Sequence, residues 1–191
     1  MDAFLFSTLV VALAEVGDKT QLLAFLLAAR FRRPWPIILG IFVATVVNHA
    51  LAGAVGTWLS TLWSPETMRW GLGLSFIAMA VWMLIPDQLD DDEARLPRLG
   101  VFGATLVAFF LAEMGDKTQI ATVALAAQYQ ALFWVVVGTT LGMMVANVPA
   151  VLLGQRIAGR MPTRWVHGTA AALFALLGLA TLLGFGQRFG L

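Results

Sequence analysis

The sequence predicts an all-α membrane protein with six transmembrane helices, arranged as two inverted three-helix repeats. Three observations lead to this fold class: an apolar composition, six long apolar segments, and a charged heptad that occurs twice. Of the 191 residues, 60% are hydrophobic, and the mean hydropathy is +0.84. A soluble domain of this length does not bury so much apolar surface, whereas windows of about 20 apolar residues span a bilayer.

Charged residues, prolines or glutamines separate the six apolar segments. The segments cover residues 3–29, 35–62, 68–86, 99–127, 132–155 and 165–186. A straight helix over the first segment would be about 40 Å long at ~1.5 Å per residue, against a hydrocarbon core of ~30 Å. We therefore expect it to tilt or to break. Gly17 and its counterpart Gly115 in the fourth segment are the natural places to unwind.

The repeated heptad is Glu-Val-Gly-Asp-Lys-Thr-Gln at residues 15–21 and Glu-Met-Gly-Asp-Lys-Thr-Gln at residues 113–119. Each copy sits in an otherwise apolar segment, where one charge costs at least roughly 2.5–3.5 kcal/mol on insertion scales. The match extends to Trp35 with Trp134 and Asn48 with Asn147, at an offset of 99, and to Phe76 with Phe174, at an offset of 98. We interpret residues 1–86 and 99–191 as two three-helix repeats, joined by an acidic cytoplasmic linker at 87–98.

The basic residues predict the orientation. Eight of the twelve Lys and Arg residues lie in the loops after the first, third and fifth segments, and only Arg69 and Arg188 lie on the other side. By the positive-inside rule these three loops are cytoplasmic and both termini lie outside the cytoplasm. Because each repeat has three spans, the second enters the membrane upside down, as in many secondary transporters that bind substrate at the midplane between repeats.

The two heptads, facing each other, would form one cation site. On an unbroken helix Glu15, Asp18 and Lys19 share one face, and Glu113, Asp116 and Lys117 repeat this. Neutral oxygen donors are available in Gln21, Gln119, Asn48 and Asn147. Hard divalent cations bind such carboxylate and amide oxygens. Four carboxylates and two ammonium groups leave a charge of −2, which one divalent cation or two protons would neutralise; this is a hypothesis of exchange.

With these residues the chain resembles the Gdt-type cation/proton exchanger family, which includes Golgi calcium/manganese transport proteins and bacterial manganese exporters. The resemblance rests on Glu-x-Gly-Asp-Lys-Thr occurring twice and covers essentially the whole chain. It implies a secondary transporter that exports manganese or calcium in exchange for protons, with no cofactor. The family's acids map onto Glu15, Asp18, Glu113 and Asp116, and its basic and hydroxyl positions onto Lys19, Thr20, Lys117 and Thr118. The absence of a long N-terminal extension leads us to expect a bacterial plasma-membrane protein.

Other functions fit less well. The net charge of +1 gives no indication of nucleic-acid binding, and the absence of cysteine excludes thiol catalysis and thiolate metal sites. An intramembrane aspartyl enzyme would not need the repeated Lys, Thr and Gln. An ion channel or a structural module, in which Glu–Lys pairs lock the repeats together, is the remaining alternative. Among exchangers, calcium is the close rival of manganese, because selectivity depends on cavity size and ligand number.

Three further features have plainer interpretations. His49 has no counterpart in the other repeat, and packing explains it more simply than metal binding. Gly138 and Gly142 form a small-xxx-small pattern typical of helix packing. We interpret the acidic run from Asp87 to Glu93 as a solvated linker between the two repeats. The functional alternative is that it attracts cytoplasmic cations.

Overall fold

The computed structural model describes residues 2–85, 99–153 and 163–184, and these form α-helices and no strand. The helices are α1 (Asp2–Glu15), α2 (Lys19–Phe31), α3 (Pro34–Leu62), α4 (Pro65–Trp82), α5 (Gly100–Glu113), α6 (Lys117–Tyr129), α7 (Leu132–Leu153) and α9 (Thr163–Leu182). The acidic run at 87–93 and the arginines at 95, 98, 156, 160 and 188 lie outside the described residues.

The first and fourth apolar segments each break into two helices. The breaks fall inside the heptads, between α1 and α2 and between α5 and α6. Gly17 and Gly115 adopt φ angles of 85° and 76°, a left-handed conformation that glycine reaches without a steric penalty. The expectation of unwinding at these glycines is confirmed, and the picture of an unbroken helix through either heptad is wrong.

The remaining helix ends follow local sequence. Pro34 and Pro65 begin α3 and α4, because the fixed φ of proline suits the first helical turn. The Ser64 hydroxyl caps α4 by accepting a hydrogen bond from the Thr67 amide at 3.2 Å. At the ends of α2 and α6, Arg32 and Gln130 adopt left-handed φ angles of 53° and 49°. These two caps lie 98 positions apart, like the heptads.

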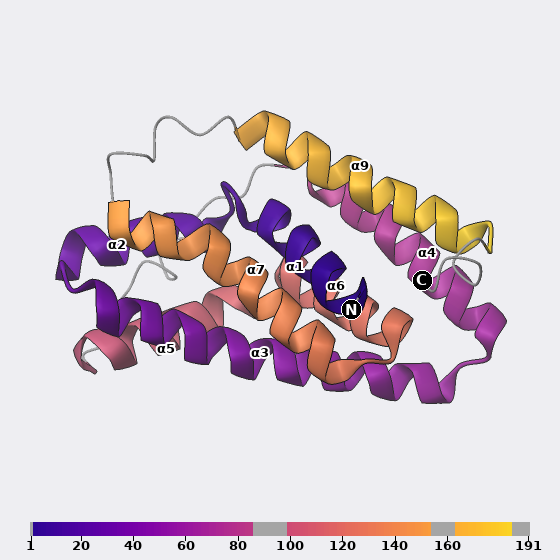
Figure 1. The fold of residues 1–191 in the computed structure, drawn as a ribbon, viewed down its shortest axis with the longest axis horizontal. Coiled ribbons are helices and arrows are strands. Elements are labelled where there is room, and N and C mark those ends of the chain that lie inside the picture. Colours follow the sequence, from indigo (N-terminus) through magenta and orange to yellow (C-terminus); the bar gives the residue numbers. More distant parts are fainter. Residues whose placement is uncertain (1, 86–98, 154–162, 185–191) are drawn as a thin grey trace.

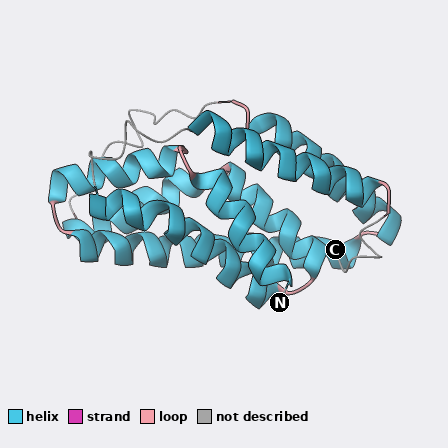
Figure 2. Ribbon diagram, turned by 45° about the horizontal axis from the view of Figure 1, so that its top comes forward, coloured by secondary structure: helices cyan, strands magenta, loops and turns pink. Residues whose placement is uncertain are grey.

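The helices pack in a pattern that is largely unchanged when the two repeats are exchanged. α1 packs against α7 as α5 packs against α3, and α2 packs against α7 as α6 packs against α3. α3 contacts α7 directly, and α4 lies alongside α9 (Figures 1 and 2). Figure 1 shows the α4–α9 pair along one edge of the molecule, whereas α2 and α5 lie at the opposite end.

Two of the described helices, α3 and α7, are long and apolar enough to cross a membrane. Their outer faces expose large apolar side chains, including Leu39, Phe42 and Leu51 on α3 and Val145 on α7. Apolar surface on this scale indicates a hydrophobic surrounding rather than water. Six tryptophans are also exposed, as expected for interfacial anchors: Trp35, Trp58, Trp63, Trp70, Trp134 and Trp165.

The glycine pair on α7 serves close helix packing, which confirms the expectation. A Cβ atom at Gly138 would lie 2.5 Å from the Phe4 carbonyl oxygen, and one at Gly142 would lie 2.6 Å from the Thr8 carbonyl oxygen. Only a residue without a side chain lets α1 approach α7 this closely. This contact brings the end of α1, and with it Glu15, against α7.

Candidate metal centre

Both heptads lie at helix breaks, and their acidic residues occupy equivalent helix ends. Glu15 ends α1 and Glu113 ends α5, while Asp18 and Asp116 occupy the N-cap positions of α2 and α6. Within each break, a glutamine side chain accepts a hydrogen bond from the glycine amide: Gln21 from Gly17 at 2.9 Å and Gln119 from Gly115 at 2.8 Å. The two glutamines therefore stabilise the unwound backbone, and their oxygens are used in doing so.

Three carboxylates from the two repeats come together in the interior. Glu15, Glu113 and Asp116 each offer an oxygen atom within 4.8 Å of the others, and all three side chains are buried. Ligand oxygens on opposite sides of a calcium ion lie about 4.6–5.2 Å apart, so this spacing suits one divalent cation. Without a cation, two ionised carboxylates at such a distance repel by roughly 3–4 kcal/mol at an effective dielectric constant of 20.

Neutral donors hold one oxygen of each glutamate. Thr20 donates to Glu15 Oε2 at 2.6 Å, and Asn147 Nδ2 lies 3.4 Å from the same atom. Thr118 donates to Glu113 Oε2 at 3.1 Å and lies 3.4 Å from Asp116 Oδ2. These contacts orient the carboxylates as outer-shell groups orient metal ligands.

The second oxygen of each glutamate has no such partner. Among the described residues, Glu15 Oε1, Glu113 Oε1 and Asn147 Oδ1 are buried and accept no hydrogen bond. A buried acceptor without a donor is costly, and a bound cation or added protons would supply partners for carboxylate oxygens of this kind. The donor set is oxygen only, which is the chemistry that hard divalent cations prefer.

The fourth predicted acid lies beside this cluster and pairs across the repeats. Asp18 Oδ1 lies 3.9 Å from Lys117 Nζ, and both side chains are almost fully buried. On the unbroken helix expected from the spacing, Glu15 and Lys19 would lie one helical turn apart on one face. That relation does not exist, because the helix is interrupted between them. Lys19 instead interacts electrostatically with Glu113 of the other repeat.

The matched asparagines differ in what they contact. Asn147, on α7, reaches Glu15. Asn48, on α3, donates to the Phe110 carbonyl oxygen at 3.1 Å and accepts a hydrogen bond from the Gln119 side chain. Gln21 donates to the Ala146 carbonyl oxygen at 3.0 Å. Asn48, Gln21 and Gln119 therefore link helices around the cluster, and Asn147 alone of these four contacts one of its acids in the described hydrogen bonds.

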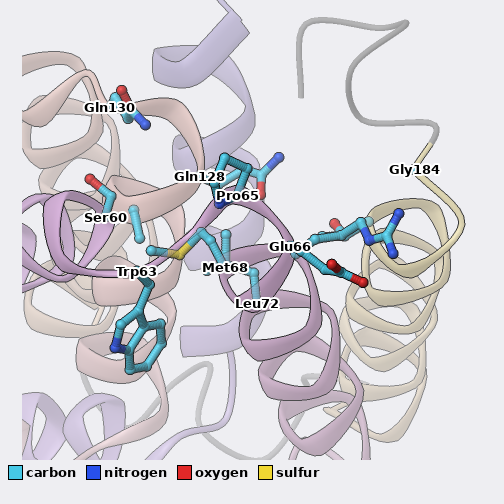
Figure 3. A pocket seen from close by; sticks show the side chains of 12 residues that line it. Ser60, Trp63, Pro65, Glu66, Met68, Leu72, Gln128, Gln130 and Gly184 are labelled. Atoms are coloured by element: carbon cyan, nitrogen blue, oxygen red, sulfur yellow. The ribbon is translucent and has the colours of Figure 1, made fainter.

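His49 is fully buried, and neither ring nitrogen has a hydrogen-bond partner among the described residues. It does not belong to the carboxylate cluster. An open pocket of about 750 Å³ also lies elsewhere, between the α3–α4 turn and the C-terminal ends of α6 and α9. Figure 3 shows Trp63, Met68 and Gln128 around it; none of the predicted site residues lines it.

Sequence reasoning missed the residues by which the third helix of each repeat contacts the heptads. Lys117 Nζ donates to the Ile85 carbonyl oxygen at 3.2 Å, just beyond α4, and lies 6.0 Å from the centre of the Trp82 ring. His167 Nε2, on α9, donates to the Val16 carbonyl oxygen at 2.7 Å. No local motif marks Ile85 or Trp82. No repeated residue marks position 167 either, because its equivalent is Arg69.

The chain matches a protein family described as "Divalent cation/proton antiporter GDT1" over residues 3–91 and 101–187. It is 54% identical over 182 residues to a Vibrio cholerae protein named "Putative manganese exporter", covering 95% of this chain and 90% of that protein. It is 30% identical to a GDT1-like protein of Synechocystis, covering 95% and 97% of the two chains. A GDT1-like protein of Arabidopsis thaliana is 27% identical, covering 91% and 68%. No solved structure matches significantly.

Proposed function

Because this chain belongs to the GDT1 family of divalent cation/proton antiporters, we propose that it exports manganese from a bacterial cytoplasm in exchange for protons. Membership makes it a membrane transporter rather than an enzyme. One observation carries the finer proposal: oxygens of Glu15, Glu113 and Asp116, drawn from both repeats, lie within 4.8 Å of one another in the buried interior. The transported ion is the substrate, and the chain needs no resident cofactor.

The proposed topology is six spans in two inverted repeats, residues 1–86 and 99–191, with a cytoplasmic linker at 87–98. The near-symmetric packing of the helices supports it, because α1–α2 relates to α7 as α5–α6 relates to α3. Both termini then lie outside the cytoplasm, α2 and α5 lie in the cytoplasmic half, and α1 and α6 lie in the outer half. The site falls at the level of the breaks, near the midplane.

Exchange follows from charge balance. The proposed centre includes Glu15, Asp18, Glu113 and Asp116, with Lys19 and Lys117 as counter-charges. Buried carboxylates this close together need counter-charge, which a divalent cation or protons supply. Only one cargo can occupy the oxygens at a time, so each displaces the other. Alternating access around this shared site would then couple cation efflux to proton influx.

Transport in proteoliposomes tests the proposal. An imposed manganese gradient should drive proton movement, read by a pH-sensitive dye, and neither ion should move alone. The double variant Asp18→Asn, Asp116→Asn should abolish both fluxes, whereas the exposed Asp2→Asn serves as a control that keeps them. Proton-coupled manganese transport by the double variant would overturn the site. Calcium is the second candidate cargo, and faster exchange of calcium than of manganese would identify it as the substrate.

A further inference from the structure

In the heptads, in the helices that follow them and in the third helices, equivalent residues of the two repeats lie 98 positions apart, whereas Trp35 and Trp134 at the start of α3 and α7 lie 99 apart. Phe76 and Phe174, equivalent by the offset of 98, lie with ring centres 6.3 Å apart where α4 meets α9. Such self-contact of equivalent residues is expected at a two-fold axis. By the same offset, Val16 corresponds to Met114, and His167 on α9 corresponds to Arg69 on α4.

The α4–α9 pair breaks the symmetry that the rest of the molecule keeps. α4 packs against α6, and α9 packs against α1. One apolar core joins residues of α1, α4, α6, α7 and α9, while the other joins α2, α3, α5 and α7 and includes neither third helix. In the described residues, the pair therefore covers the half of the molecule that contains α1 and α6, as Figure 1 shows.

Equivalent residues of the two repeats differ in solvent exposure because of this one-sided packing of α4 and α9. Ala127 on α6 is 4% exposed, whereas its equivalent Ala29 on α2 is exposed. Val16 in the first break is half-buried, whereas Met114 in the second is 57% exposed. Identical or similar side chains thus stand in two environments, because the third helices lie against only one of the two halves.

One hydrogen bond fixes α9 to the first break. A helix break leaves backbone carbonyl groups outside the helical ladder, and His167 Nε2 donates to that of Val16 at 2.7 Å. At the equivalent place in α4, Arg69 lines the open pocket of about 750 Å³. Its Nε atom is buried and has no hydrogen-bond partner among the described residues. The Nε–H of Arg69 is therefore a buried donor without an acceptor among the described residues, whereas the equivalent His167 donates to Val16.

We infer that His167 and Arg69 are matched positioning residues that hold opposite end states of the transport cycle. The inference rests on the proposed function and its inverted repeats. In the state described here, His167 holds α9 to Val16, and α4 and α9 lie over α6 and α1. In the opposite state, Arg69 donates to the Met114 carbonyl oxygen, and the pair lies over α5 and α2. Neither side chain touches the cation; each acts by placing the third helices.

The lysines of the heptads follow the same exchange. Lys117 now donates to the Ile85 carbonyl oxygen at the end of α4 and pairs with Asp18. The equivalent of Ile85 is Leu183, at the end of α9. In the opposite state Lys19 donates to Leu183. In its own end state, each lysine thus links one acid-bearing break to one third helix. A change at the site therefore alters a contact that positions α4 or α9.

Cysteine labelling tests this directly, because the natural sequence contains no cysteine. Ala29→Cys and Ala127→Cys, made singly, report the two halves through their rates of reaction with a small water-soluble maleimide. When the protein passes to the opposite state, α4 and α9 leave α6 and pack over α2. Position 127 then becomes exposed and position 29 becomes covered. His167→Ala should raise the rate at 127 relative to 29 by about 2- to 12-fold, the worth of one neutral hydrogen bond. Arg69→Ala should change the ratio in the opposite direction.

The controls separate positioning from loss of fold. His167→Gln keeps a side-chain N–H donor and should restore the ratio, as should Arg69→Lys. Three results would overturn the inference. The ratio could change in the same direction in His167→Ala and Arg69→Ala, it could stay unchanged, or labelling could become faster at both positions in each variant. Manganese-driven proton flux is measured on the same vesicles. If manganese drives proton flux but the labelling ratios of the two variants do not change in opposite directions, the inference about His167 and Arg69 is overturned and the proposed function is not. If the ratios change in opposite directions but manganese drives no proton flux, the proposed cargo is overturned and the inference is not.

Discussion

The heptads at residues 15–21 and 113–119 differ at one position of seven, yet α9 covers the first break and the second is exposed at Met114 and Gly115. What the two copies share is local: the glycine φ angle, the aspartate cap and the glutamine that holds the glycine amide. What differs is contributed by α4 and α9. The heptad therefore determines the chemistry of the centre, whereas the third helices, α4 and α9, determine its surroundings.

The largest effect should come from removing one glutamate. Glu15→Gln and Glu113→Gln should each reduce manganese transport more than about 100-fold, because even outer-shell changes cost about 10–100-fold in metal affinity. Equal losses are expected, since both acids serve one cluster. Initial rates of manganese efflux from vesicles measure this. Substantial transport in either variant would break the equivalence of the heptads.

Substitution of the two heptad lysines should have unequal effects on stability. Lys117 is 1% exposed and pairs with Asp18, whereas Lys19 is half-buried. Removing one partner of a buried ion pair costs about 3–5 kcal/mol. Lys117→Met should therefore lower the thermal midpoint of the detergent-solubilised protein clearly more than Lys19→Met does. Unfolding followed by tryptophan fluorescence gives both midpoints, and an equal drop would show that the third helices do not distinguish the lysines.

The threonines should have intermediate effects. Thr20 donates to Glu15 at 2.6 Å, whereas Thr118 lies at longer distances from two acids. Thr20→Val and Thr118→Val should weaken manganese binding by about 10–100-fold, with Thr20→Val the more severe. Titration calorimetry of each variant provides the comparison, with the matched Thr20→Ser and Thr118→Ser retaining most of the affinity. Unchanged affinity in the valine variants would argue against orientation by hydroxyl groups.

The smallest effect concerns the backbone of the exposed break. A Cβ atom at Gly115 would meet nothing within 4 Å, so Gly115→Ala carries only the cost of a left-handed φ, about 1–2 kcal/mol. Gly115→Asn should cost less, because asparagine tolerates this conformation better. Chemical unfolding of the two variants tests the order. Greater stability of Gly115→Ala than of Gly115→Asn would contradict the role given to the positive φ.

Much of the architecture could be predicted because the responsible signals are local. Charges in apolar segments marked the heptads, and Gly17 and Gly115 marked the breaks. The pairing of Asp18 with Lys117 could not be read from either heptad, since both copies offer the same groups and only tertiary packing chooses among them. The contacts of Ile85 and His167 were equally hidden, because they depend on where α4 and α9 lie along the other helices.

Asn48 illustrates the same limit. Asn48 and Asn147 are matched candidate donors, yet Asn147 reaches Glu15 while Asn48 contacts Gln119 and the Phe110 carbonyl oxygen. Sequence symmetry predicts which residues are equivalent; it does not predict that equivalent residues have equal neighbours in any one state. The difference is itself informative, because an alternating transporter must break its own symmetry to open on one side.

The stoichiometry of manganese binding tests most directly whether the two heptads form one site. Equilibrium dialysis of the purified protein should give one manganese ion per chain. Glu15→Gln or Glu113→Gln alone should abolish that binding at manganese concentrations that saturate the natural sequence. Two ions per chain, or one ion retained when a single heptad is altered, would contradict a single shared site, because each heptad would then bind cations independently.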